Sequence, residues 1–543
     1  MKRINIIDAG IKPDGCVSER LTQLISDAGD DVELYFPSGS YYISKPVRVE
    51  GRRGLTFLGD NATIVTHFTP DGDPSENNNG FNCRDCRGLT FTGFTCTTDN
   101  PLGAEGRVVA VDNSAHTYDV KIDDKYQVTG WEHFWGTDTF DEDGTPDYVI
   151  ETYDKIVTET LTGDDGKPRK KFTGTRYEVI GDHMIRVYMP EYFDLSRLNI
   201  GHRVHYRYLI YGNTLFSFAD CHDVTLRDIE IERCASMGAV ISPRSSNFVF
   251  DNFNIRPREG SGELYAANAD GIHIVGLAGS LIMKNCKFAQ LGDDALNIHN
   301  QAGEISAIAR DGGQTKIDII SRLNLGGESK IRELVYGFAA AGDKFRVYEK
   351  DSFIKKGGFE VVSYESGHAV IENIEGSVEV GDIIANETFF ASVQIENCEV
   401  RNTRARGFLL QSENMTVKDC RFYGMSLPGL LIAPDVIVWY EVGPSNNTVI
   451  SGCEFIKCAV VSNDAAIMVR AAHDGRGEGY PAGVHRNLTI KGNSFSECGG
   501  SAICVSSTDN VAITGNRFDS GDTDKNVRLI NCANIVRSDA NTD

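Results

Sequence analysis

The sequence predicts an all-β protein whose fold is a right-handed parallel β-helix (a solenoid) with two inserted small antiparallel β-domains. The first observation is a repeat, in which equivalent positions recur after 22 residues (Cys398 to Cys420) to 24 residues (Ile229 to Phe253). A repeat of about 20–30 residues in a strand-rich chain is typical of a solenoid with one coil per repeat. The second is alternation of apolar and polar residues within each repeat, as in strands with one buried face. The third is the scarcity of helical patterns, of which Val17–Ala28 is the only convincing one.

Each repeat contains a common unit. Apolar residues at alternate positions are followed by a polar residue or glycine, then by cysteine or asparagine, as in Leu281–Phe288 and Val393–Val400. Residues one coil apart stack along the β-helix, so cysteines at this position are expected to form an interior column and to behave as small hydrophobic side chains. The cysteines in this column are Cys286, Cys398, Cys420 and Cys453.

Two long segments interrupt the repeat. It is absent from 95 to 228 and from 289 to 392, although strand-like alternation persists, for example in Lys344–Tyr348. Asp311-Gly312 is typical of a hairpin turn. The expected organisation has five segments: residues 1–104 (an N-terminal cap that contains the predicted helix, and the first coils), 105–210 (an inserted β-domain), 211–300 (coils with the candidate catalytic acids), 301–390 (a second inserted β-domain) and 391–543 (the C-terminal coils).

Composition narrows the classes of partner. The 543 residues include 54 Lys and Arg against 77 Asp and Glu, which gives a net charge of −23 and a pI near 5.0. This balance argues against nucleic acid and anionic membranes as partners. No apolar run reaches the roughly 18 residues of a transmembrane helix. A homodimer is one assembly that the sequence leaves open.

The N-terminal segment has no apolar region or cleavage site of the kind found in signal peptides. Met1–Asp8 runs directly into sequence with a strand pattern. We therefore expect a location in the bacterial cytoplasm, or in the periplasm or medium if a leader was removed.

Clustered acids are the strongest functional signal. Asp270 lies in Asn268–His273, and Asp293 and Asp294 lie in Gly292–His299. Asp270 and Asp293 are 23 residues apart, nearly one repeat, so the motifs are expected to stack about 4.7–4.9 Å apart. Like charges this close are costly and are mostly kept where chemistry uses them. The alternative is turn chemistry, because Asp beside Gly is common at corners.

Strand alternation counts against the turn interpretation. Asp294, Leu296 and Ile298 share one face of a strand, so a regular strand that buries the two apolar residues also buries the carboxyl group. Either a bend turns Asp294 outward, or Asp294 is buried with a raised pKa. Asn297 and His299 are expected to project outward.

Clustered acids without a metal-binding signature suit glycoside hydrolysis. One carboxylic acid protonates the leaving oxygen, and another carboxylate activates water or attacks. The alternative, Ca²⁺-assisted β-elimination, usually draws on more scattered acids and a basic residue. Cys83–Cys86 has CxxC spacing, but no second such pair completes a zinc site. We expect no metal and no cofactor.

The acidic motifs resemble those of the polygalacturonase group of glycoside hydrolases, although the Gly-His-Gly and Arg-x-Lys motifs of that group are missing. The fuller resemblance is to glycoside hydrolase family 110, the α-1,3-galactosidases, and it covers essentially the whole chain. The features that carry it are the two predicted β-domain insertions and the segments Asp270–His273, Gly292–His299, Arg406–Gln411 and Trp439–Glu441.

The resemblance to family 110 implies an inverting exo-hydrolase that releases terminal α-1,3-linked galactose from blood group B type or linear α-galactosyl glycans. The implied partner is an oligosaccharide or glycan substrate with a terminal α-galactose. By analogy with the polygalacturonase group, Asp293 is the general acid, and Asp270 and Asp294 hold and deprotonate the water. Stacking distance alone does not settle inversion, which needs about 6.5–9.5 Å between acid and base.

Eight further residues are candidates for substrate binding, each with a structural alternative. The histidines could bind sugar hydroxyls or stack within a column, and the tryptophan could support a sugar ring or fill the core. The arginines, one coil from the acids, could orient a hydroxyl or an acid. In chain order the candidates are His273, Asn297, His299, Arg404, Arg406, Trp439, Tyr440 and Glu441. The loop 470–476 could form a second wall of the site or a solvated loop.

Two other functions stay open at this point. A polygalacturonase-like hydrolase of uronate polysaccharide needs basic groups around the acids to hold carboxylates, and the acidic composition counts against it. A non-catalytic glycan-binding β-helix needs the acids only to bind hydroxyls.

Overall fold

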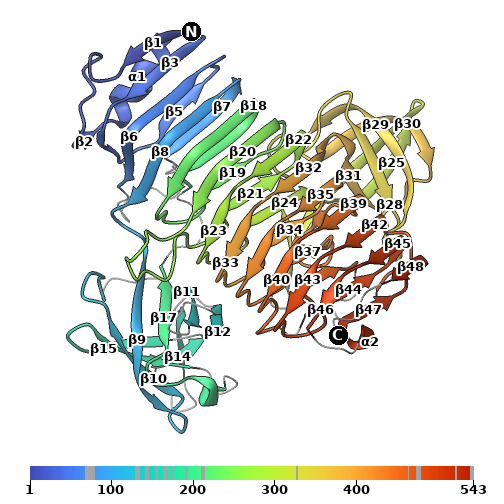
Figure 1. The fold of residues 1–543 in the computed structure, drawn as a ribbon. Coiled ribbons are helices and arrows are strands. Elements are labelled where there is room, and N and C mark those ends of the chain that lie inside the picture. The colour runs from blue at the N-terminus through green and yellow to red at the C-terminus, as the bar shows by residue number, and fades with distance from the viewer. Residues whose placement is uncertain are drawn as a thin grey trace.

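The computed structural model describes residues 1–67, 80–128, 135–140, 146–153, 157–162, 168–173, 176–189, 194–208, 214–325, 328–462, 464–471, 479–519 and 523–538. The predicted fold class is confirmed, because the chain forms a parallel β-helix that carries two antiparallel β-sheets as insertions (Figure 1). The coils run from the N-terminus to the C-terminus along a single axis, so residues many repeats apart never meet.

Strands of the N-terminal coils pair in parallel with those of the next coil. They are β1 (Lys2–Asn5), β2 (Gly15–Cys16), β3 (Val32–Phe36), β4 (Gly39–Ile43), β5 (Val47–Glu50), β6 (Thr56–Thr66), β7 (Phe81–Arg87) and β8 (Thr90–Thr98). Both β7 and β8 then pair with the long strand β18 (Phe216–Ile231), which continues the β-helix beyond the first insertion.

From β18 onward the coils build three parallel stacks. The stack that carries the site contains β19 (Ala239–Ile241), β21 (Ile272–Val275), β24 (Leu296–Gln301), β34 (Phe408–Leu410), β37 (Leu430–Ile432), β41 (Ile467–Val469), β44 (Ile503–Ser506) and β47 (Val527–Ile530). The second contains β20 (Ser246–Ile255), β22 (Leu277–Lys284), β32 (Phe390–Glu396), β35 (Glu413–Lys418), β39 (Asn446–Ser451), β42 (His485–Lys491), β45 (Thr508–Thr514) and β48 (Ala533–Ser538). The third contains β23 (Lys287–Ala289), β33 (Glu399–Arg401), β36 (Arg421–Tyr423), β40 (Glu454–Ile456), β43 (Ser494–Ser496) and β46 (Arg517–Phe518).

The polar residue before the cysteine column makes the tight turn between two of these stacks. Asn285, Asn397 and Asp419 have φ angles of 55°, 53° and 51°. Asn and Asp adopt this left-handed conformation more readily than other non-glycine residues. Nδ2 of Asn397 also donates a hydrogen bond to Oδ1 of Asn285 at 2.7 Å, one coil away. Backbone geometry and this side-chain ladder therefore explain the polar position of the repeat.

Aromatic rings fill the interior of the C-terminal coils. Neighbouring centroids are 4.8 Å apart for Phe422 and Phe455, and 5.0 Å apart for Phe455 and Phe495. Burial of each such side chain contributes about 1.5–3 kcal/mol. The column of Cys286, Cys398, Cys420 and Cys453 is buried beside them with free thiols.

The single long helix of the described chain, α1 (Ser18–Ala28), begins one residue after the predicted start and packs against β5. Leu21 and Ile25 are buried on its inner face, at an i, i+4 spacing that places them on one side of a helix. A second helix, α2 (Thr523–Asn526), is a single turn near the C-terminus.

The first insertion contains a seven-stranded antiparallel sheet in the order β12-β11-β17-β9-β10-β16-β15, with a separate hairpin β13–β14. Its elements are β9 (Gly103–Asp112), β10 (Thr117–Ile122), β11 (Trp135–Phe140), β12 (Pro146–Tyr153), β13 (Val157–Thr162), β14 (Pro168–Thr173), β15 (Arg176–Gly181), β16 (Met184–Tyr188), the 3₁₀ helix η1 (Leu195–Arg197) and β17 (Arg203–Arg207).

The second insertion contains a seven-stranded antiparallel sheet in the order β25-β31-β28-β29-β30-β26-β27. Its elements are β25 (Gly303–Asp311), β26 (Gln314–Leu325), β27 (Glu328–Arg332), β28 (Lys344–Tyr348), β29 (Lys355–Glu365), β30 (His368–Gly376), β31 (Ile383–Asn386) and the 3₁₀ helix η2 (Glu387–Phe389). β25 starts two residues after β24, so this insertion stands next to the acidic motifs.

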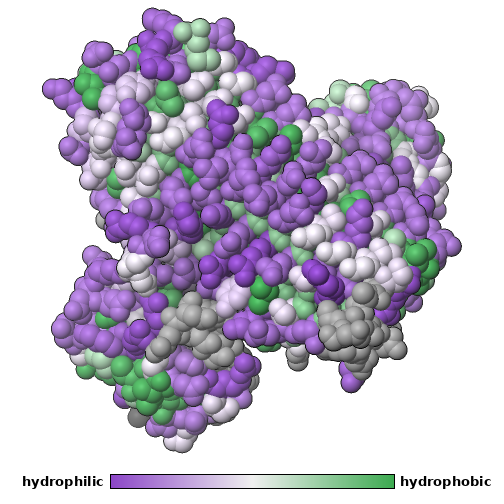
Figure 2. Space-filling view, in the orientation of Figure 1, coloured by the Kyte–Doolittle hydropathy of each residue, from purple (hydrophilic) through white to green (hydrophobic). Residues whose placement is uncertain are grey.

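Hydrophilic side chains cover most of the face shown in Figure 2. Among the described residues, no helix has the length and apolar character needed to cross a membrane.

Candidate functional site

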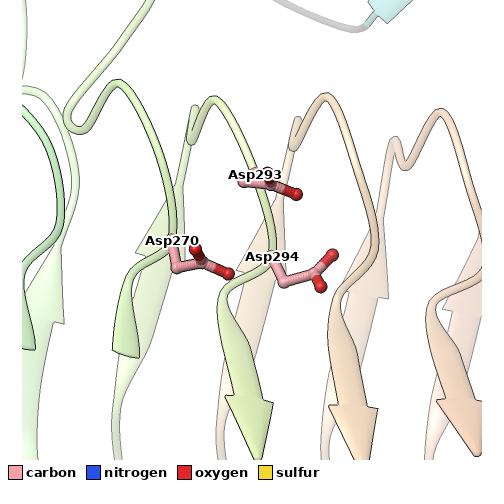
Figure 3. A group of neighbouring side chains, drawn as sticks. All are labelled: Asp270, Asp293 and Asp294. Carbon is pink, nitrogen blue, oxygen red and sulfur yellow. The ribbon is translucent and has the colours of Figure 1, made fainter. Parts of the chain in front are cut away.

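Three charged residues occupy one position in three successive coils. β21 pairs with β24, and β24 with β34, in registers that align Asp270, Asp294 and Arg406. The amide of Gly271 donates to the carbonyl oxygen of Asp294 at 2.8 Å. The local repeat is therefore 24 residues, and the expectation that Asp293 stacks on Asp270 was wrong by one residue. Asp293 lies in the turn before β24 and still reaches the same patch (Figure 3).

The three carboxyl groups form a compact acidic cluster, the acid trio of Asp270, Asp293 and Asp294. One oxygen atom from each residue lies within 4.8 Å of the other two. Asp294 is completely buried and Asp270 is 3% exposed, whereas the side chain of Asp293 is 24% exposed. The crowding predicted from the sequence is present, and Asp293 is the member most open to solvent.

Arg406 holds Asp294 in place. The Arg406 backbone amide and Nε donate to Oδ1 of Asp294 at 3.0 and 2.7 Å, and Arg406 Nη2 lies 3.9 Å from Oδ1 of Asp293. Burial raises the pKa of Asp294 to about 8, against the opposing charge of Arg406 and with added repulsion from Asp293 and Asp270. Of the two outcomes expected from strand alternation, the structure shows the buried carboxyl group with a raised pKa.

A buried histidine pair adjoins Asp270. Burial and the charge of Asp293 raise the pKa of Asp270, and His273, with Nδ1 3.4 Å from Asp270 Oδ2, opposes this. Burial lowers the pKa of His273, but the charge of Asp270 outweighs it and raises that pKa to about 9. His273 Nε2 lies 3.3 Å from Nε2 of His299, whose pKa burial holds well below its ordinary value. A charged His273 thus donates to a neutral His299, which in turn donates from Nδ1 to the carbonyl oxygen of Asn300 at 3.3 Å.

A cavity of about 720 Å³ opens over the acid trio. One wall comes from the site-bearing stack of the β-helix, another from residues 433–439 and Glu441, and a third from the second insertion at Arg332, Glu333 and Val335. Sites for small ligands typically have volumes of about 300–1,000 Å³. The cavity is therefore large enough for one or two sugar rings.

Three oxygen acceptors in the cavity wall have no hydrogen-bond partner among the described residues: Asp294 Oδ2, Asn297 Oδ1 and Gln411 Oε1. The three residues are 0%, 7% and 1% exposed. Nε2 of Gln411 donates to Oε2 of Glu441 at 3.2 Å, which leaves the Gln411 oxygen without a donor. Buried acceptors without donors are costly. Hydroxyl groups of a bound ligand, or ordered water, would satisfy them.

A short loop before β38 (Glu441–Val442) carries an aromatic side chain to the cavity. Two backbone hydrogen bonds of 2.8 Å between Asp435 and Glu441 close this loop. Trp439 is 42% exposed and lines the cavity. Oε1 of Glu441 lies 3.6 Å from Nε2 of His299, and burial raises the pKa of Glu441. The loop therefore joins an apolar surface to the histidine pair.

Two of the predicted binding residues do not line the cavity. Tyr440 has a left-handed backbone (φ 54°), and its hydroxyl donates to Oε2 of Glu304 in the second insertion at 2.8 Å. It therefore anchors the loop beside Trp439. Arg404 Nη1 donates to the carbonyl oxygen of Gly292 at 3.3 Å, behind the acid trio. The predicted residues that do line the cavity are Asp270, His273, Asp293, Asp294, Asn297, His299, Arg406, Trp439 and Glu441.

Other cavity residues were not singled out in the sequence. Gln411 occupies the same position as His299 in the next coil, so the repeat register was the signal that could have found it. Arg332 comes from an insertion, where no repeat register applies. Arg470, the first residue of the predicted second wall, also lines the cavity, whereas residues 472–476 of that loop lie outside the described residues.

The acid trio also has a spacing that could hold a metal ion. Ca²⁺ takes 6–8 oxygen ligands, whereas Arg406 already donates to Asp294 and lies close to Asp293. A guanidinium therefore already supplies positive charge at the trio. The expected absence of a metal stays a prediction.

Comparison with known proteins agrees with the fold and with the resemblance found in the sequence. A model of the right-handed β-helix region matches residues 350–541. α-1,3-Galactosidase A of Akkermansia muciniphila is 30% identical over 291 residues, which cover 51% of this chain and 45% of that protein. α-1,3-Galactosidase A of Shewanella woodyi is 24% identical over 80% of this chain and 70% of that protein. α-1,3-Galactosidase B of Bacteroides thetaiotaomicron is 24% identical over 91% and 82%, respectively.

Solved structures with some similarity are the catalytic domain of a GH87 α-1,3-glucanase in complex with nigerose and a family 28 exopolygalacturonase of Yersinia enterocolitica. Their TM-scores are 0.42 and 0.35, with 12% and 10% sequence identity. The matches cover 100% of this chain in both cases, and 68% and 78% of those chains. At this level neither structure bears on the chemistry of the site.

The match to the Akkermansia relative spans less than half of that protein's length. The sequence relatives nevertheless share one printed activity, and together they support a glycoside hydrolase that acts on α-linked sugars. The chain is a right-handed parallel β-helix protein related in sequence to the α-1,3-galactosidases.

Proposed function

We propose that this protein is an exo-acting, inverting glycoside hydrolase that releases terminal α-1,3-linked galactose from blood group B type or linear α-galactosyl glycans. The sequence relatives, all of them α-1,3-galactosidases by name, support the substrate class. The exo mode comes from the resemblance to family 110.

The observation that carries the proposal is the acid trio beneath the unsatisfied acceptors of the cavity wall. Asp294 has a pKa of about 8, so the trio retains a proton near neutral pH that a general acid can deliver. The acceptors on Asn297 and Gln411 require donors, and a sugar supplies them as hydroxyl groups. The exposed ring of Trp439 offers an apolar surface for the C–H face of galactose.

Hydrolysis needs one proton donor and one base. Asp293, the most exposed acid, donates a proton to the glycosidic oxygen as the bond from that oxygen to C1 of galactose breaks. Asp270 and Asp294 hold the water that attacks C1, and the proton that this water loses passes to them. Arg406 keeps Asp294 oriented throughout through its two hydrogen bonds.

The inverting outcome rests on the resemblance and not on distance. Inverting pairs are typically about 6.5–9.5 Å apart and retaining pairs about 5–5.5 Å, whereas the closest oxygens of the trio lie within 4.8 Å of one another. The anomer formed first therefore tests the scheme directly.

The experiment is proton NMR during incubation with Gal-α-1,3-Gal and with the branched B-type trisaccharide. We expect β-galactose to appear first from one or both. First-formed α-galactose would keep the activity but refute the inverting scheme, and no product from either would refute the proposed function.

A variant series separates catalysis from binding. Asp293→Asn should lower kcat by at least about 10²-fold, the lower end of the usual contribution of a general acid, while binding of galactose measured by calorimetry persists. Asp228→Asn is the matched control, because Asp228 is an exposed carboxylate on β18 outside the cavity. Turnover by Asp293→Asn at the control's rate would favour a glycan-binding protein or a different acid.

One observation favours a second candidate, a hydrolase of uronate polysaccharide. Arg332, Arg406 and Arg470 all line the cavity, and such a hydrolase needs basic groups to hold carboxylates. Polygalacturonate is therefore included in the same NMR series. Cleavage of polygalacturonate alone would replace the galactosidase proposal.

A further inference from the structure

The first insertion reaches both acidic motifs through one buried arginine. Arg207 ends β17 and is 3% exposed. Its Nη1 donates to the carbonyl oxygens of Asn268 at 3.0 Å and Gly292 at 2.9 Å. Asn268 lies two residues before Asp270, and Gly292 immediately precedes Asp293. One nitrogen atom therefore joins the two successive coils that carry the acid trio.

The coils are in close contact at this point. A Cβ atom on Gly292 would lie 2.3 Å from the carbonyl oxygen of Asn268 and 3.0 Å from Nη1 of Arg207. The carbonyl oxygen of Gly292 also accepts a hydrogen bond from Arg404 of the following coil at 3.3 Å. Three successive coils and the first insertion thus meet at a single carbonyl group, directly before Asp293.

The side chain of Asn268 is held by the same insertion. Its Nδ2 donates to the carbonyl oxygens of Pro101 at 2.8 Å, Leu102 at 3.1 Å and Ala235 at 3.0 Å. Its Oδ1 lies 3.3 Å from Nε2 of His205, another residue of β17. The main chain and the side chain at this motif position therefore both depend on the base of the insertion.

Simple anchoring of the insertion does not account for Arg207. Arg233 of the β-helix already ties the insertion down, 3.4 Å from Glu105 of β9 and with a 3.0 Å hydrogen bond to Tyr126. Arg207, in contrast, forms no ion pair with any described residue. A buried guanidinium without a carboxylate partner is costly, and an apolar residue would often be more stable there. A cost retained beside a functional cluster indicates a functional role.

We infer that Arg207 is a positioning residue that sets the separation between the coil of Asp270 and the coil of Asp293. Its two hydrogen bonds fix the relative height of the two coils, and hence the distances over which the acid trio shares its proton. The inference rests on the proposed hydrolase function for its catalytic consequence, but not for its structural one.

The test compares Arg207→Met with Arg203→Met. Arg203 is the matched control, because it also lies on β17, is largely buried, and bonds a β-helix carbonyl oxygen, that of Gly262, away from the acid trio. We expect Arg207→Met to lower kcat at least tenfold with KM within threefold, and to shift a limb of the pH profile of kcat by at least half a pH unit. Arg203→Met should leave kcat within twofold and the profile unchanged.

Two outcomes would overturn the inference. In the first, Arg207→Met keeps the wild-type kcat and pH profile. In the second, both variants lose activity and melting temperature in parallel, which is the behaviour of a purely structural anchor. If Arg207→Met does not fold, Arg207→Lys is measured in its place, because lysine keeps the charge but has a shorter side chain and should give an intermediate kcat.

A titration without turnover separates this inference from the proposed function. Protein labelled with ¹³C at the aspartate carboxyl carbon is titrated by NMR, with the trio assigned through Asp→Asn variants. An altered titration of the trio in Arg207→Met, but not in Arg203→Met, supports positioning even if no tested glycan is hydrolysed. An unaltered titration refutes positioning even if the wild type is an active galactosidase.

Discussion

Asp294 is fully buried, and its replacement by asparagine tests the electrostatics of the site without any assay of activity. Asparagine has the shape of a protonated aspartate, and its Oδ1 can still accept the two hydrogen bonds from Arg406. The substitution removes only the charge. It should therefore stabilise the protein wherever the ionised side chain is unfavourable in the folded state.

The size of the effect follows from the pKa. Burial raises the pKa of Asp294 from the ordinary 3.8 to about 8, and each pH unit between these values corresponds to about 1.4 kcal/mol. The folded state binds the proton more tightly than the unfolded chain, so the free energy of unfolding falls as pH rises from about 4 to about 8. Asp294→Asn removes that loss. The variant should be more stable by about 4 kcal/mol at pH 7 and nearly unchanged at pH 4.

Differential scanning calorimetry measures this difference. With an unfolding entropy of about 2.1 cal/mol/K per residue, a chain of 543 residues gains about 1 °C in Tm for each kcal/mol. We expect Asp294→Asn to raise Tm by about 3–4 °C at pH 7. The control is Asp228→Asn, which replaces an exposed carboxylate whose side chain is 55% accessible and should change stability by less than about 0.5 kcal/mol at every pH.

The result that would refute this reasoning is specific. A Tm for Asp294→Asn equal to or below that of the wild type at pH 7 would mean that the buried carboxyl group carries no penalty there. A Tm difference that does not grow between pH 5 and pH 8 would mean that Asp294 is not the titrating group.

Three further predictions concern the proposed activity. Trp439→Ala should raise KM by about tenfold with kcat within threefold, since a ring contact is worth about 0.5–1.5 kcal/mol; an unchanged KM for Gal-α-1,3-Gal would contradict the platform role. Arg406→Met should lower kcat by at least about 10²-fold, because it leaves the buried carboxyl of Asp294 without its partner, whereas Arg227→Met, an exposed arginine on β18, should match the wild type. Dialysis against EDTA should leave the rate within twofold, and loss of activity that Ca²⁺ restores would contradict metal-free hydrolysis.

Local pattern was sufficient to predict the β-helix. The turn residues Asn285 and Asn397 and the cysteines that follow them recur because each coil repeats the same backbone geometry. The same periodicity brought Asp270 to the two acids of the next coil, although the local repeat of 24 residues makes Asp294 its stacking partner. Strand alternation likewise limited Asp294 to two outcomes, and burial was one of them.

The direction of individual side chains near the insertions could not be predicted in this way. Trp439 and Tyr440 are adjacent in the sequence, yet one lines the cavity and the other bonds Glu304, because the left-handed backbone at Tyr440 interrupts any regular alternation. Arg332 reaches the cavity from β27, a strand of the second insertion that lies outside the repeat.

The sequence by itself determined the coil, its period and the meeting of the acid trio, because these depend on contacts between neighbouring repeats. The tertiary structure alone decided that Arg207 joins the two acidic coils and that Gln411 leaves an acceptor without a donor in the cavity. Arg207 contacts residues 61 and 85 positions away. Contacts over such separations follow from how each insertion docks on the β-helix, and a repeat pattern carries no information about that docking.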